Sequence, residues 1–190
     1  MSFGFEQPVD KIDKAIRFAD DNKVIMLAAA SNQGGNSNIA WPARLSQVIC
    51  VYATDSFGNR CDFTPTESPY GDNFAVLGQA VKSCWPASLG QDEIRKSGTS
   101  TATPIAAGIA AITLAYLKRA LSKWDRNLSD NDAAILSKVR SSAGMSTVFR
   151  RMAQRKRGGY DYIVPWDFLD AAKYTESTVC EIVLGDLKAI

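Results

Sequence analysis

A serine that could act as a nucleophile lies between a glycine-containing turn and a run of small apolar residues. Ser100 follows Gly98 and Thr99, and residues 101–117 carry no charge. A serine hydroxyl attacks a carbonyl carbon only when a base takes its proton, and the oxyanion that forms needs hydrogen-bond donors. The N-terminus of a helix supplies such donors through its free backbone N–H groups. On spacing alone, the pattern favours a hydroxyl of Thr99, Ser100 or Thr103 that only caps the helix, and the alternative is a nucleophile at the start of a buried helix.

The histidine that most often serves as the base for such a serine is absent from the sequence. The 190 residues include no histidine, so they cannot form a Ser–His–Asp triad by themselves. Lys96 lies four residues before Ser100, and serine–lysine pairs exist as a chemistry. Because Lys96 precedes the turn, we expect its side chain to point to solvent rather than toward the serine.

Buried strands and helices would have to position this serine. Continuous apolar runs, which are typical of strands buried on both faces, predict strands over residues 23–31, 47–54 and 73–78. Apolar residues at helical spacing predict helices over residues 9–21, 105–121 and 129–142, the last capped by Ser129 or Asp130. This order predicts an α/β fold in which helices cover both faces of a parallel sheet. Ligands bind beyond the carboxyl ends of such strands, so the loop Ser31–Asn36 is expected at the site.

Two sequence blocks in this order resemble the subtilisin-like serine proteases. The block "SGTSTATPIAAGIAA" is similar to the segment around the nucleophilic serine of that family, and it aligns that serine with Ser100. The block "AAASNQGG" is similar to the segment that carries the oxyanion asparagine, which would be Asn32. Trp41-Pro42-Ala43 resembles the Tyr-Pro-Ala of the family, and Ser31 stands where the family usually has glycine. The related sedolisins have aspartate at the position of Asn32, so Asn32 favours the subtilisin branch.

The same resemblance implies a substrate cleft. The segment "MSFGF" looks like the strand end of the family whose backbone pairs with bound substrate. Ser2, Phe3 and Gly4 would then form one wall of the cleft. Ala29, Ala30 and Ser31 would belong to the primary specificity pocket.

The resemblance further implies that the chain corresponds to the C-terminal half of a catalytic domain. The catalytic aspartate and histidine of the family lie on earlier segments, so residues 1–145 would be the C-terminal part of the peptidase domain and residues 146–190 an extension packed on it. We expect a serine endopeptidase that is inactive, and marginally stable, unless the missing half is supplied in cis or in trans. The alternative is a catalytically dead remnant that binds a peptide or a protein partner.

Other classes of function have weaker signals. The basic residues between Arg150 and Arg157 lack interleaved aromatic residues, so nucleic-acid binding is not expected. Subtilisin-like proteases often bind calcium, but the acidic residues Asp55, Asp62, Glu67 and Asp72 match no calcium-binding loop, so we expect neither a metal nor another cofactor.

The uncharged run also raises the question of a membrane span. Residues 101–117 are slightly short for a membrane span and rich in Ala, Thr and Gly, so a buried helix is expected and a membrane span is not. The four cysteines are scattered without zinc-ligand spacing, and no signal peptide opens the sequence, which favours an intracellular setting over a secreted one.

Overall fold

The structure is a computed structural model that describes residues 1–86, 88, 90, 93–123, 129–155 and 158–190. Its central sheet has the strand order β1-β2-β3-β7-β6, and a separate hairpin pairs β4 with β5. The strands of the sheet are β1 (Leu27–Ala29), β2 (Ile49–Thr54), β3 (Phe74–Leu77), β7 (Asp161–Ile163) and β6 (Ala153–Arg155), and those of the hairpin are β4 (Val81–Cys84) and β5 (Glu93–Lys96). The longer helices are α1 (Asp10–Asp21), α2 (Thr99–Lys123), α3 (Asp130–Ser137), α4 (Ser142–Met152) and α6 (Glu176–Lys188). The short helices are the 3-10 turn η2 (Lys138–Arg140) and α5 (Pro165–Phe168).

Four of the five strands in the sheet are parallel, and the α/β class expected from the sequence is confirmed. β1, β2, β3 and β7 pair in parallel, and β6 runs antiparallel to β7. The strand expected over residues 23–31 is shorter, because its first residues close the end of α1. Lys23 has a φ of 58° in that turn, and the N–H of Val24 donates to the carbonyl of Ala19.

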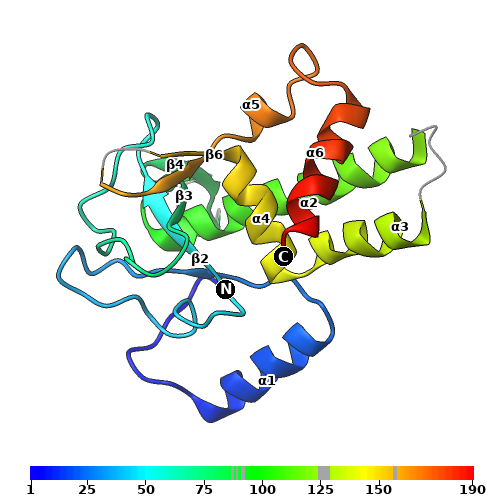
Figure 1. Ribbon diagram of the computed structural model, residues 1–190. Coiled ribbons are helices and arrows are strands. Elements are labelled where there is room, and N and C mark those ends of the chain that lie inside the picture. The colour runs from blue at the N-terminus through cyan, green and yellow to red at the C-terminus, as the bar shows by residue number, and fades with distance from the viewer. Residues whose placement is uncertain (87, 89, 91–92, 124–128, 156–157) are drawn as a thin grey trace.

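The helices divide between the two faces of the sheet. Residues of β2 such as Val51 share a core with α2, α4 and α6, whereas Ile16 of α1 packs with Met26 and Ala28 on the opposite face. Figure 1 shows α1 apart from the group formed by α2, α3, α4 and α6. Ser129 caps α3 by accepting a hydrogen bond from the N–H of Asp132, which decides between the two candidate caps.

α2 is long and apolar enough to cross a membrane by length and composition alone. In the fold it packs against β1, β2, β3 and α6. Its buried positions are small residues such as Ala102, Ala106 and Ala110, which let the helix axis approach the sheet closely. The buried small residues of this run therefore serve helix–sheet packing, whereas Ala107, Gly108 and Ala111 are exposed.

The residues after 145 continue the same sheet and core. The boundary expected at 145 lies inside α4, and β7 adds a parallel strand beside β3. Val179, Cys180, Val183 and Leu187 of α6 are fully buried in the main core. At the surface, an ion pair also joins α4 to α6: the guanidinium of Arg151 donates two hydrogen bonds to the carboxylate of Asp186.

Candidate active site

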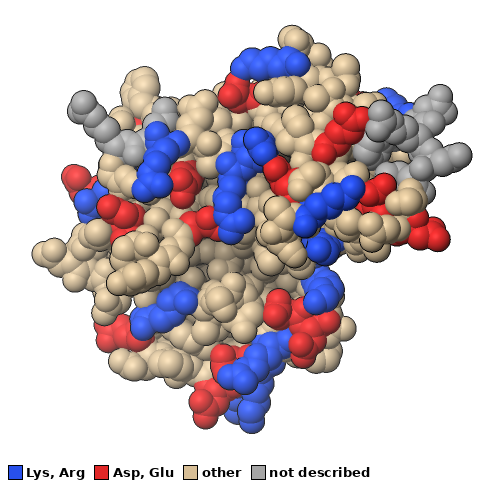
Figure 2. Space-filling view, viewed as in Figure 1, with Lys and Arg blue, Asp and Glu red and all other residues tan. Residues whose placement is uncertain are grey.

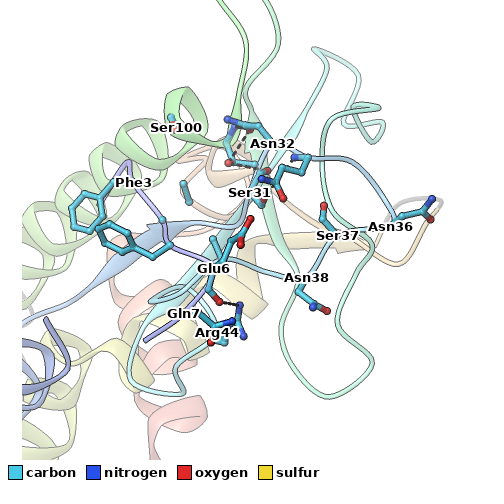
Figure 3. Close-up of a pocket in the computed structure, with 16 residues that line it drawn as sticks. Phe3, Glu6, Gln7, Ser31, Asn32, Asn36, Ser37, Asn38, Arg44 and Ser100 are labelled. Carbon is cyan, nitrogen blue, oxygen red and sulfur yellow. Dashed lines mark hydrogen bonds between the residues drawn. The ribbon is translucent and has the colours of Figure 1, made fainter. Parts of the chain in front are cut away.

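Ser100 lies in the first turn of α2, directly after the β4–β5 hairpin. Its hydroxyl Oγ donates to the carbonyl of Ser2 at 3.2 Å, and the Ser2 hydroxyl donates to the carbonyl of Ser100 at 3.0 Å. This reciprocal pair joins the segment before α1 to the start of α2. Ser100 also lines a cleft, whose residues are drawn in Figure 3.

A proline explains why the Ser100 carbonyl is available to Ser2. In a helix this carbonyl would accept from the N–H four residues later, and that residue is Pro104, which has none. The sequence suggested a helix beginning after Pro104, yet α2 begins at Thr99 and includes the proline. The hydroxyl of Ser2 replaces the missing helical donor, so the first turn of α2 keeps its hydrogen bonding.

Asn32 lies in the loop after β1 and contacts the residue before Ser100. Its side-chain oxygen Oδ1 accepts from the backbone N–H of Thr99 at 2.8 Å and from the Thr99 hydroxyl at 3.1 Å. The same hydroxyl also contacts the carbonyl of Ser31 at 3.2 Å. Because both contacts hold the oxygen of the amide, its nitrogen Nδ2 remains available as a donor beside the N-terminus of α2.

Gly98 permits this close approach. It has a φ of 151°, and a Cβ atom built on it would lie 3.1 Å from Nδ2 of Asn32. A side chain at this position would strain the backbone and crowd the amide. The glycine before Thr99 and Ser100 is thus required by the geometry of the turn and by Asn32.

The cleft beside Ser100 has a volume of about 590 Å³. Of the residues that the resemblance assigned to substrate, Phe3, Gly4, Ala29 and Ser31 line it, together with Asn32 and Ser100. Ser2 contacts Ser100 directly, whereas Ala30 is buried behind the cleft in a core with Tyr52 and Tyr160. The cleft therefore brings together three segments that are distant in the sequence, residues 3–7, 29–44 and 99–100.

Several polar residues of the cleft were not singled out from the sequence. They are Glu6, Gln7, Gln33, Asn36, Asn38 and Arg44. The guanidinium of Arg44 donates to the backbone carbonyl of Glu6 at 3.3 Å. Gln33 and Asn36 belong to the loop Ser31–Asn36 that the sequence placed at the site, whereas nothing in the local sequence marks Glu6, Gln7 and Arg44, because their exposed loops meet only in the folded chain.

Within the described part of the chain, Ser100 has no basic side chain as a hydrogen-bond partner. The ammonium group of Lys96 instead lies over the ring of Trp85, 4.7 Å from its centroid. Lys96 is therefore engaged on the hairpin, in agreement with the expectation that it does not serve the serine.

Asp55 and Asp72, two of the four acidic loop residues, have structural roles. Asp55 accepts from the backbone N–H groups of Phe57 and Asn59 and so closes the turn after β2. Asp72 forms a two-bond ion pair with Arg150. Among the described residues, no group of three or more His, Cys, Asp or Glu side chains is placed to hold a metal ion.

Two arginines of the basic run form ion pairs within the chain. Arg150 and Arg151 bind Asp72 and Asp186, while Lys156 and Arg157 lie outside the described residues. On the face drawn in Figure 2, basic and acidic side chains are interspersed. The paired arginines are thus partly neutralised before any partner could bind.

The sequence of this chain is similar to those of known proteins. The model of the Subtilase family matches residues 1–151. The chain belongs to the subtilase family. The chain is 35% identical over 114 residues to M-protease of Shouchella clausii, which is 59% of this chain and 28% of that protein. It is also 35% identical over 114 residues to Subtilisin Savinase of Lederbergia lenta, of which it covers 39%.

Solved structures show the same fold. The self-cleaved protease domain of PatA superposes with a TM-score of 0.64 at 22% identity, covering 96% of this chain and 58% of that one. This subtilase chain therefore spans well under half of the two curated relatives and a little over half of that protease domain. The recognition of a subtilisin-like serine protease from its motifs is confirmed at the level of family and fold.

Proposed function

We propose that this chain carries the nucleophile and the oxyanion donors of a serine endopeptidase. Ser100 would attack the carbonyl carbon of a peptide bond. The side-chain nitrogen of Asn32 and the backbone N–H of Ser100 would donate to the oxyanion that forms. The observation that carries the proposal is the Asn32 amide, whose oxygen is held by Thr99 so that its nitrogen is left to donate.

The base would come from outside these 190 residues. The sequence has no histidine, and no described base contacts Ser100. We infer that a further subtilase segment with the catalytic Asp and His completes the site, either in the same polypeptide or as a partner. An apolar hollow supports such a neighbour: it has a volume of about 740 Å³, is lined by Phe3, Ile12 and Pro104, and lies next to the Ser2–Ser100 contact.

A second candidate is a catalytically dead peptide-binding protein. One observation favours it: the cleft is present beside Ser100, yet no basic side chain among the described residues contacts that serine. Peptide or protein is the expected ligand in both cases, and neither candidate involves a metal, another cofactor, nucleic acid or a membrane.

Labelling with a fluorophosphonate probe distinguishes the two candidates. The probe would be applied to the chain alone and to the completed domain, by which we mean this chain combined with a subtilase segment that carries the Asp and the His. We expect labelling of the completed domain only, and its loss in Ser100→Ala. An unlabelled, well-folded completed domain would favour the peptide-binding protein, and labelling of the chain alone would show that a base within the chain had been missed.

A further inference from the structure

The cleft beside Ser100 combines two aromatic rings with one unpaired carboxylate. Phe3 and Phe5 line it with exposed fractions of 47% and 42%, and their ring centroids are 5.8 Å apart. Glu6 follows directly and also lines the cleft. Within the described residues no cation lies within ion-pair distance of the Glu6 carboxylate.

The backbone that carries Glu6 is held in place from two sides. Phe5 forms an antiparallel bridge with Trp41, in which each backbone N–H donates to the carbonyl of the other residue at 2.8 Å. The Arg44 guanidinium donates to the Glu6 carbonyl at 3.3 Å. Figure 3 shows Glu6 among the residues that line the cleft, with Arg44 bound to its backbone carbonyl.

The side-chain amides of Gln7, Gln33 and Asn38 also line the cleft, and their oxygens can accept hydrogen bonds from a cationic head group, although their N–H groups can equally donate. A long side chain with an apolar stem and a cationic head matches the rings and the carboxylate together, because Lys and Arg pack their stems on apolar surface. A large aliphatic side chain would cover these amides without bonding to them, which is unfavourable.

Resting on the proposed function, we propose that this cleft selects a peptide with Lys or Arg at the residue before the scissile bond, and that Glu6 determines this choice. Arg44 is a positioning residue that holds the Glu6 backbone. Because Glu6 is exposed, its ion pair with the substrate contributes a modest preference, about fivefold in affinity at low salt.

Peptide binding tests this choice without requiring catalysis. Fluorescein-labelled Ala-Ala-Pro-Xaa-Ser-Gly peptides, with Xaa as Lys, Leu, Gln or Glu, would be titrated into the 190-residue chain and followed by fluorescence anisotropy. We expect the Lys peptide to bind about fivefold more tightly than the Leu and Gln peptides, and the Glu peptide to bind most weakly. Raising the salt concentration should reduce the preference.

Charge variants complete the test. Glu6→Gln should bring the Lys and Gln peptides within about twofold of each other, and Glu6→Lys should favour the Glu peptide. The matched control Asp10→Asn, in the exposed first turn of α1, should leave the preference unchanged. A preference for Lys that survives Glu6→Gln, tightest binding of the Glu peptide, or no binding of any peptide to the folded chain would overturn the proposal.

The outcomes of the two experiments are separable. Binding that favours Lys, combined with absence of probe labelling in the completed domain, would leave the specificity standing and remove the catalytic function. Probe labelling of the completed domain, combined with peptide binding that shows no preference for charge, would leave the catalytic function standing and remove the specificity.

Discussion

Thr99 is the residue on which the orientation of the proposed oxyanion donor depends. Its backbone N–H and its hydroxyl both bind Oδ1 of Asn32, and it is fully buried. An asparagine side chain can present either its oxygen or its nitrogen to a cleft. Two donors on one side leave only the nitrogen free for an oxyanion.

Replacing Thr99 with valine tests this role in the completed domain. Thr99→Val keeps the shape but removes the hydroxyl, and we expect kcat to fall about tenfold with little change in KM. Loss of the donor itself costs about 10²–10³ in kcat, so an indirect effect should be smaller. Thr99→Ser keeps the hydroxyl and should retain most of the activity. A change confined to KM, or an equal loss in Thr99→Ser, would contradict an orienting role.

At the scale of elements, the segment before α1 is attached to the site by close backbone packing. A Cβ atom on Gly4 would lie 2.5 Å from the Cβ atom of Ala40, so the two stretches of chain approach as closely as glycine allows. Phe5 and Trp41 pair immediately beside this contact. The cleft wall formed by Phe3 and Glu6 therefore depends on a small residue at position 4.

A double-mutant cycle measures this packing. We expect Gly4→Ala to lower the free energy of unfolding by about 1–3 kcal/mol, because the added methyl group overlaps Ala40. Ala40→Gly in the same chain should restore part of the loss. Urea denaturation followed by circular dichroism gives these values. Additive effects of the two substitutions would show that the two residues do not touch.

α6 supplies a second test at the scale of elements. Leu187 is fully buried in the core with Val139 and Met145, whereas Ile112 on α2 is 64% exposed. Leu187→Ala should cost about 2–5 kcal/mol of unfolding free energy because it leaves a cavity. The matched control Ile112→Ala should cost less than about 0.5 kcal/mol in the isolated chain. If both substitutions lowered the free energy of unfolding equally, α6 would not belong to the core that unfolds cooperatively.

At the scale of the whole molecule, buried thiols link stability to pH. Burial raises the pKa of Cys50 from 9.0 to about 12 and, with nearby acidic groups, those of Cys61 and Cys180 to about 11. In the unfolded chain these thiols ionise near their ordinary pKa. The unfolded state therefore binds fewer protons than the folded state above pH 9, and stability falls as pH rises.

Urea denaturation between pH 7 and pH 10.5 checks this dependence. We expect a decline above about pH 9, with each fully linked thiol contributing up to about 1.4 kcal/mol per pH unit. Cys180→Ala should reduce the slope, although it lowers stability at every pH. An unchanged slope in that variant would show that Cys180 ionises equally in both states.

The sequence by itself determined the fold class and the two residues at the centre of the proposed site. Continuous apolar runs identify strands buried on both faces, and the blocks around Asn32 and Ser100 are local motifs, so both can be read without coordinates. The sequence predicted that this helix begins after Pro104, whereas α2 begins at Thr99. The earlier start could not be predicted, because the hydroxyl that replaces the missing N–H of Pro104 belongs to Ser2, far away in the sequence.

Only the tertiary structure decided what surrounds that centre. Glu6, Arg44 and Asn38 come from exposed loops without periodicity, and Glu6 and Arg44 share a cleft because Phe5 pairs with Trp41, far away in the sequence. The orientation of the Asn32 amide likewise follows from contacts with Thr99, 67 residues away along the chain. Local patterns specify which segments are buried, whereas long-range contacts specify which polar groups meet.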